Sequence, residues 1–117
     1  MILSDLSILE NKTFPVTIIG SGPAGISTAL ELDKYNIETL IIEAGGRNFS
    51  DEQESFFNGY LNNSEFPSLY SKRTRAFGGT SYRWGGYCNR FEKEELENWP
   101  LTHAELHEHE NECNKIL

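Results

Sequence analysis

Two short apolar runs with a helical stretch between them form the clearest pattern near the start of the chain. Residues 16–19 (VTII) and 39–42 (TLII) are continuous runs rich in β-branched residues, which is typical of buried strands. Residues 23–34 (PAGISTALELDK) carry a helical pattern. The order strand, helix, strand over residues 16–43 predicts a βαβ unit and therefore an α/β fold.

The rest of the chain has weaker patterns. Residues 1–14 are a polar lead-in, and residues 45–75 are loop-like, with one short helix expected among them. Thr102 and Glu105 have the spacing of a capping box, which predicts a helix over about 103–117. The scattered aromatic residues of the loop-like stretch are expected to pack rather than to line a substrate site: Phe56, Phe57, Tyr60, Phe66 and Tyr70.

A glycine-rich turn joins the first predicted strand to the helix. Its glycines are spaced Gly20-x-Gly22-x-x-Gly25. The first permits a sharp turn, the second lets the backbone approach a pyrophosphate, and the third lets the helix pack closely on the strand. Pro23 suits the first turn of the helix, whose free N–H groups and dipole attract phosphate.

Glu43 ends the second predicted strand, where a carboxylate can accept hydrogen bonds from ribose hydroxyls. A tight turn of small residues without a ligand is the alternative interpretation. Strand, turn, helix and acid in this order favour dinucleotide binding instead. An acid at this position disfavours a 2′-phosphate, so a cofactor of the NADP type is not expected here.

A second glycine cluster, RAFGGTS, covers residues 75–81. Adjacent glycines beside hydroxyl residues make a backbone surface that a flat or anionic ligand can approach, and Arg75 has the fork geometry that suits phosphate oxygens. An ordinary surface loop has a similar composition. The position after a dinucleotide fingerprint favours a cofactor contact, whereas Arg73 and Arg83 are left outside the candidate site as solvated charges.

These motifs together resemble known flavoenzymes. Pro23-Ala24 inside the glycine loop and EAGG at residues 43–46 are similar to the opening of FAD-dependent oxidoreductases. RAFGGTSYRWGG at residues 75–86, followed by WPL at 99–101, resembles the glucose–methanol–choline (GMC) oxidoreductase family, particularly its bacterial branch. The resemblance implies that residues 1–117 are the N-terminal part of a Rossmann-like FAD-binding domain, with a flavin-contacting loop at about 73–90.

The resemblance also assigns residues to the cofactor. Some members of the family attach FAD covalently through a His just before the Trp of the second motif, but Arg83 stands there, so we expect FAD to be held non-covalently. The cofactor-binding candidates are Gly20, Gly22, Pro23, Ala24, Gly25, Glu43, Ala44, Arg75, Gly78, Gly79, Thr80 and Ser81, with Trp84 and Gly85 nearer the flavin ring.

The activity that the resemblance implies is oxidation of a CH–OH group of an alcohol or sugar by hydride transfer to FAD. The substrate within that class and the electron acceptor stay open. In the GMC family the base near the flavin is a late His paired with His or Asn, and none of the three histidines here matches it. No catalytic residue is therefore assigned, and a non-catalytic nucleotide-binding module or remnant stays as the alternative.

Two strands and one crossover helix make an incomplete sheet, because stable parallel sheets need more strands and helices on both faces. The predicted terminal helix also lacks a stop signal. We therefore expect the chain to be a piece of a longer flavoprotein fold. By itself it should be marginally folded, hold FAD poorly and be inactive.

Charge and composition exclude some classes of binding partner. The net charge of −8 argues against nucleic acid or an anionic membrane surface, which need clustered Lys and Arg. No apolar run is long enough for a membrane anchor and no signal peptide is evident, so a cytoplasmic location is expected. Cys88 and Cys113 should be reduced thiols. His103 and His107 have a possible metal-ligand spacing, but an acidic solvated helix face explains them more simply, and no metal is predicted.

Overall fold

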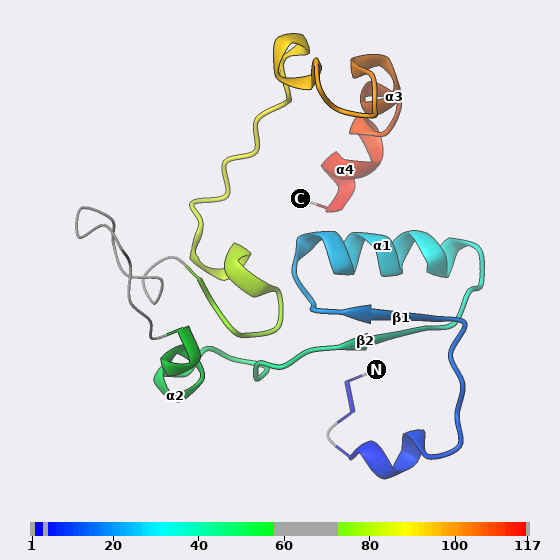
Figure 1. Ribbon diagram of the computed structural model, residues 1–117, viewed down its shortest axis with the longest axis vertical. Coiled ribbons are helices and arrows are strands. Elements are labelled where there is room, and N and C mark those ends of the chain that lie inside the picture. Colours follow the sequence, from blue (N-terminus) through cyan, green and yellow to red (C-terminus); the bar gives the residue numbers. More distant parts are fainter. Residues whose placement is uncertain (1, 4, 58–72, 117) are drawn as a thin grey trace. The chain divides into compact units, whose positions relative to one another are not determined.

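The computed structural model describes residues 2–3, 5–57 and 73–116 (Figure 1). The chain divides into two compact units, residues 1–84 and 85–117. Of the aromatic residues expected to pack in the loop-like stretch, Tyr60, Phe66 and Tyr70 lie outside the described residues.

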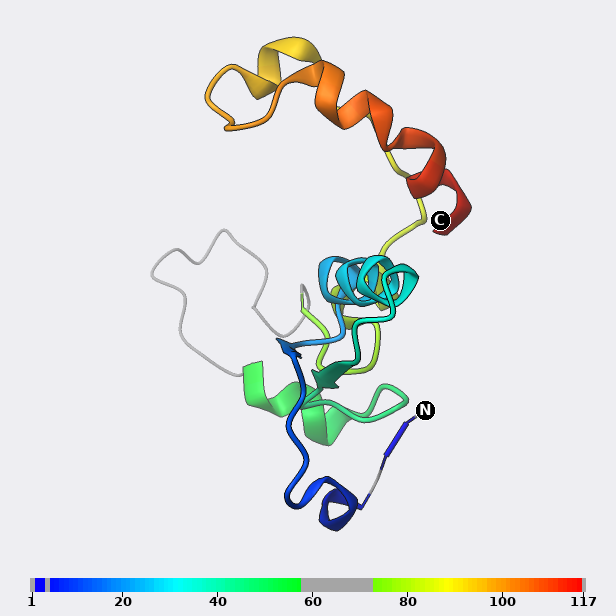
Figure 2. The same ribbon diagram turned by 90° about the vertical axis from the view of Figure 1, so that its right-hand side faces the viewer.

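The first unit is built on a parallel pair of strands with a helix along one side. β1 (Val16–Ile19) pairs in parallel with β2 (Thr39–Ile42), and the first residues of the two strands lie opposite each other. α1 (Pro23–Lys34) connects them, and it is seen nearly end-on above the strands in Figure 2. The bounds of all three elements are those that the hydrophobic pattern predicts.

Local sequence signals explain where α1 begins and ends. Pro23 occupies its first turn, where a missing N–H has no intrahelical partner to lose. At the other end Asn36 adopts a left-handed φ of 55° and donates its N–H to the Asp33 carbonyl at 2.9 Å, while the N–H of Ile37 reaches the Leu32 carbonyl at 3.1 Å. This is a Schellman ending, which Asn tolerates better than most non-glycine residues.

The face of the strand pair that turns away from α1 is largely uncovered. Ile19 and Ile42 lie opposite each other in the register and are 88% and 50% exposed. Parallel sheets of this class are normally covered on both faces. Within the described residues the sheet has two strands, and it is therefore incomplete there.

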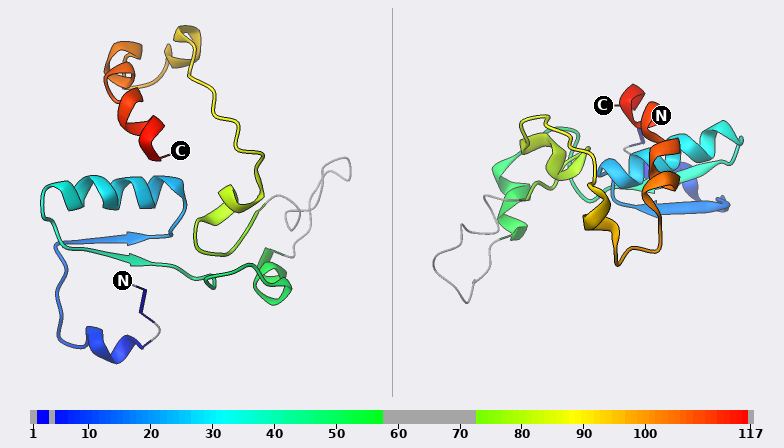
Figure 3. Two further views of the ribbon diagram at one scale, coloured as in Figure 1. Left: turned by 180° about the vertical axis from the view of Figure 1, so that it is seen from behind. Right: turned by 90° about the horizontal axis from the view of Figure 1, so that it is seen from above.

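The chain after β2 leaves the sheet and then returns to it. Ser50 caps the short helix α2 (Asp51–Glu54), which confirms the short helix expected in the loop-like stretch, and a 3-10 turn, η2 (Ser55–Phe57), follows. The returning segment makes a parallel bridge between Ala76 and Gly46 and continues into the 3-10 turn η4 (Gly79–Arg83). In Figures 1 and 3 this returning segment lies beside the start of α1.

The most buried positions of the first unit lie where these segments meet. Ser21, Glu54 and Ala76 are each 0% exposed, and Thr74 is 6% exposed. Two of the fully buried side chains are therefore polar or charged, which is costly unless hydrogen bonds or ion pairs satisfy them.

The second unit contains a 3-10 turn, η5 (Lys93–Leu96), and two short helices, α3 (His103–Glu108) and α4 (Glu110–Ile116) (Figure 3). Among the residues of this unit whose burial is described, Leu96 is the buried apolar one, at 6% exposure, and the ring centroids of Phe91 and Trp99 lie 5.1 Å apart. The predicted capping box is present, because the side chains of Thr102 and Glu105 each accept from the other residue's backbone N–H.

The single helix predicted over about 103–117 is wrong, because the structure interrupts it at His109. The N–H of His109 donates to the Leu106 carbonyl at 3.1 Å, three residues back instead of four. Almost every side chain of α3 is exposed, so no apolar stripe packs against a partner to hold a continuous α-helix through this polar stretch.

Two other expectations concern the cysteines, predicted to be reduced thiols, and the membrane. Cys88 and Cys113 are both exposed free thiols. None of the helices in the described part of the chain has the length and apolarity that crossing a membrane requires.

Candidate functional site

The turn between β1 and α1 leaves open space in front of the helix N-terminus. Gly20 has a φ of 97°, which lets the chain turn sharply. Gly22 is the N-cap residue of α1, and no side-chain hydrogen bond caps the helix there. A Cβ built on either glycine would meet no atom within 4 Å. Because free N–H groups and the helix dipole attract anions, this turn fits a pyrophosphate.

Gly25 has a different task, which is to bring α1 close to β1. A Cβ at this position would collide with the carbonyl oxygen of Gly20 and would lie 3.2 Å from Cγ2 of Ile18. Only glycine permits this approach, which places the N-terminus of the helix directly at the end of the strand.

Glu43 and Ser21 connect the end of β2 to the glycine loop. Oε2 of Glu43 accepts from the Ser21 N–H at 2.9 Å and from the Ser21 hydroxyl at 2.6 Å, and Oε1 accepts from the Gly45 N–H at 2.6 Å. Partial burial raises the pKa of Glu43, but hydrogen bonds from Ser21, Gly45 and Ala44 outweigh it, so this pKa lies below its ordinary value. The charged carboxylate is thus held beside the loop.

The second glycine cluster packs onto the same serine. The N–H of Gly78 donates to the Ser21 hydroxyl at 3.2 Å and to the Ser21 carbonyl at 3.1 Å. A Cβ on Gly79 would lie 3.2 Å from the Cα of Gly22. The two glycine clusters therefore lie against each other. They are distant in the sequence, since Ser21 and Gly78 are separated by 57 positions.

The segment after β2 adds a second backbone junction. A Cβ on Gly45 would collide with the backbone of Arg75 and Ala76, and the N–H of Phe77 donates to the Gly46 carbonyl at 2.9 Å. The glycines that follow Glu43 thus permit the returning segment to pass at backbone contact distance.

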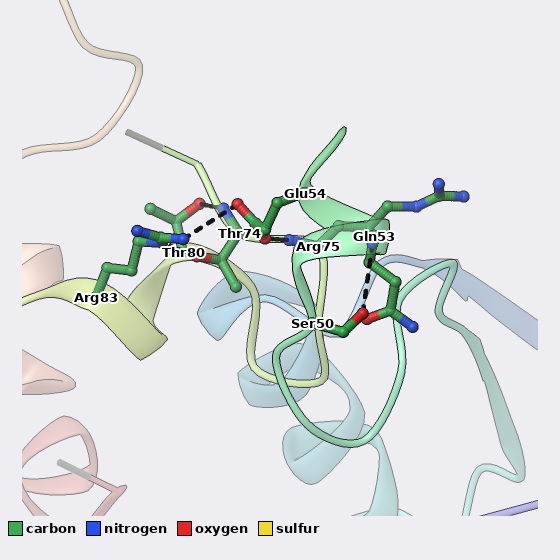
Figure 4. Close-up of polar contacts among 7 residues, drawn as sticks. All are labelled: Ser50, Gln53, Glu54, Thr74, Arg75, Thr80 and Arg83. Atoms are coloured by element: carbon green, nitrogen blue, oxygen red, sulfur yellow. Dashed lines mark hydrogen bonds and ion pairs between the residues drawn. The ribbon is translucent and has the colours of Figure 1, made fainter. Parts of the chain in front are cut away.

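Glu54 is a buried acid that the sequence analysis missed. Its Oε1 accepts from the Arg75 N–H at 2.9 Å, and its Oε2 pairs with Nη2 of Arg83 at 3.3 Å (Figure 4). The Nε of Arg83 donates to the Thr74 hydroxyl at 2.7 Å, so Arg83 is anchored rather than solvated. One acid in the polar run DEQES carries no sequence signal that separates it from its exposed neighbours.

Three residues predicted to bind the cofactor contact other groups of the protein instead. The guanidinium of Arg75 lies over the ring of Phe56, 4.3 Å from its centroid. The hydroxyl of Thr80 accepts from the Thr74 N–H at 3.4 Å, and the hydroxyl of Ser81 donates to the Gly78 carbonyl at 2.7 Å. In this structure both hydroxyls stabilise the turn in which they lie.

The remaining candidates are exposed. They include Pro23, Ala24 and Ala44. Trp84 is 48% exposed at the end of the first unit, and Gly85 begins the second unit. Within the first unit the structure therefore gathers Gly20, Gly22, Gly25, Glu43, Gly78 and Gly79 around Ser21.

Two histidines of the second unit lie close to each other, and one of them pairs with a carboxylate. The rings of His103 and His107 are stacked at 6.3 Å, and Nδ1 of His107 lies 2.9 Å from Oε2 of Glu110. Among the described residues, no group of three or more His, Cys, Asp or Glu side chains could hold a metal ion.

Strand, glycine turn, helix, parallel strand and terminal acid define a Rossmann-like dinucleotide-binding fold. The chain belongs to the pyridine nucleotide-disulphide oxidoreductase family, whose sequence profile matches residues 14–110. It therefore carries an FAD- or NAD(P)-binding domain of the oxidoreductase class.

The family is the one finding that the comparisons with known proteins give for this chain. The searches of curated proteins and of solved structures found no match. The match does not confirm the resemblance to the GMC family, nor an alcohol or sugar as the substrate.

Proposed function

We propose that this protein binds FAD non-covalently and serves as a flavin-dependent oxidoreductase acting on a CH–OH group of an alcohol or sugar. The observation that carries the cofactor assignment is the junction at Ser21. This buried residue contacts the carboxylate of Glu43 and the N–H of Gly78, and it precedes Gly22 in the loop. An acid, an open helix N-terminus and a second glycine cluster are thereby placed together, as an extended dinucleotide requires.

FAD is favoured over a nicotinamide cofactor by the second glycine cluster. The segment RAFGGTSYRWGG resembles the flavin-contacting segment of the GMC family, and its first part packs on the glycine loop. When bound, FAD supplies the hydride acceptor, and the protein supplies binding and orientation. The residues proposed to hold it are Gly20, Gly22, Pro23, Ala24, Gly25, Glu43, Ala44, Arg75, Gly78, Gly79, Thr80 and Ser81, with Trp84 and Gly85 toward the flavin ring.

Arg83 supports a non-covalent linkage. It stands where some members of the GMC family, which the segment resembles, carry the His that binds FAD covalently, and a guanidinium cannot replace the imidazole as an attachment point. Its Nε and Nη2 are also engaged by Thr74 and Glu54. The proposal of an alcohol or sugar substrate rests on the resemblance alone.

Titration of the full-length protein with FAD, NADH and NADPH, followed by fluorescence, tests the cofactor assignment, because residues 1–117 by themselves are expected to hold FAD poorly. FAD should bind most tightly, and Glu43→Ala should raise its Kd about tenfold because the charged acceptor for ribose hydroxyls is lost. Glu38→Gln, at an exposed position before β2, serves as the control. Preference for NADH or NADPH, or unchanged FAD binding in Glu43→Ala, would contradict the assignment.

The proposed reaction is tested by supplying the FAD-loaded full-length protein with a panel of alcohols and sugars and an artificial electron acceptor. Reduction of the acceptor that depends on one of these substrates supports the proposal. Tight FAD binding without turnover of any of them would instead support a nucleotide-binding module.

A further inference from the structure

The Glu54 carboxylate contacts both ends of the segment that carries the second glycine cluster. The side chain is 0% exposed. Oε1 accepts from the backbone N–H of Arg75, before the glycines, and Oε2 pairs with the guanidinium of Arg83, after them (Figure 4). One side chain thereby closes the loop over residues 75–83.

Arg83 is held firmly enough to act as the far anchor of this loop. Besides Glu54, it contacts the Thr74 hydroxyl through Nε at 2.7 Å, and its guanidinium lies 4.8 Å from the centroid of the Phe49 ring. The side chain is 31% exposed, so the pair is only partly screened by water. A buried carboxylate is stable in such a place because charged and backbone donors satisfy it.

We propose that Glu54 is a positioning residue for the cofactor: through Arg83 it holds Gly78 and Gly79 in the orientation in which they face the glycine loop. This inference rests on the proposed function, because it takes FAD as the ligand. Gly78 and Gly79 have left-handed φ values of 90° and 62°, conformations that a free glycine segment would exchange with many others. Fixing both ends of the loop removes that freedom before the ligand arrives and so raises affinity.

Glu54→Gln separates the charge from the shape of the side chain. The amide oxygen of Gln can still accept from the Arg75 N–H, but its NH2 group then faces the donor Nη2 of Arg83. The Kd for FAD should rise about tenfold, as expected for the loss of a charge-assisted contact in a partly screened site. Glu52→Gln, the same substitution at an exposed position of the same helix, should change it less than about twofold.

Arg83→Met and the double variant Glu54→Gln/Arg83→Met show whether Glu54 acts through Arg83. In the Arg83→Met background the further effect of Glu54→Gln should fall below about twofold. Additive effects would instead show that Glu54 does not act through Arg83. Exchange of the amide hydrogens of residues 74–84 without FAD should be faster in Glu54→Gln and unchanged in Glu52→Gln. If Glu54→Gln fails to fold, Arg83→Met tests the same contact.

The outcomes separate this inference from the proposed function. A wild-type full-length protein that binds no FAD overturns the proposed function and, with it, the cofactor role of Glu54. Wild-type binding with unchanged affinity in Glu54→Gln, or with equal effects of Glu54→Gln in both backgrounds, overturns the inference alone.

Discussion

Replacement of Ser21 by alanine should weaken the whole junction between the glycine loop, β2 and the second glycine cluster. The lost hydroxyl donates to the Glu43 carboxylate at 2.6 Å in a fully buried position. Hydrogen bonds to charged groups contribute about 1.5–3 kcal/mol. The N–H of Gly78 keeps its bond to the Ser21 carbonyl at 3.1 Å, so no buried donor is left without a partner. The expected loss in the free energy of unfolding is therefore about 2 kcal/mol.

Urea unfolding followed by circular dichroism measures this loss, and a Tm lower by about 8 °C should accompany it. Ser27→Ala is the matched control, because Ser27 is exposed in the middle of α1 and alanine there has a slightly better helix propensity. It should change the free energy of unfolding by no more than about 0.5 kcal/mol.

The reasoning is refuted if Ser21→Ala and Ser27→Ala have the same free energy of unfolding. That result would mean that the hydroxyl group of Ser21 contributes nothing to the free energy of unfolding. A large loss in both variants would point to α1 itself rather than to the junction.

Three other measurements address separate parts of the site. Gly25→Ala should lower the free energy of unfolding, measured by urea unfolding, by about 3 kcal/mol, because the added Cβ collides with the backbone carbonyl of Gly20. A loss below about 1 kcal/mol would show that α1 can move away from β1. Acid precipitation of the FAD-loaded full-length protein should release all flavin into the supernatant, since Arg83 cannot be the attachment point; a pellet that stays yellow would contradict this. The lowered pKa of Glu43 means that its stabilising contribution is complete above about pH 4.3, the unfolded value, and is lost as the pH falls through the lower folded pKa. Glu43→Gln should flatten this acid limb of the stability profile, and an unchanged limb would show that other groups cause it.

The sequence alone determined the local architecture of the first unit. Runs of β-branched residues predict strands, a proline at the first turn predicts where α1 begins, and the glycine spacing predicts the turn between them. These signals act over a few neighbouring residues, so β1, α1 and β2 are found at the expected positions. The capping box at Thr102 is equally local and is confirmed, whereas continuation of that helix past His109 needed packing that the unit does not provide.

Only the tertiary structure decided which polar residues matter at the site. Ser21 lies between two glycines in the motif and Glu54 lies in an acidic run, and neither position is marked in the sequence as buried. Both become buried because the chain returns after β2 and packs residues 74–83 against the glycine loop. Once water is excluded there, each polar group must be satisfied by a partner distant in sequence, and the pairings of Ser21 with Glu43 and of Glu54 with Arg83 exist only in the folded chain.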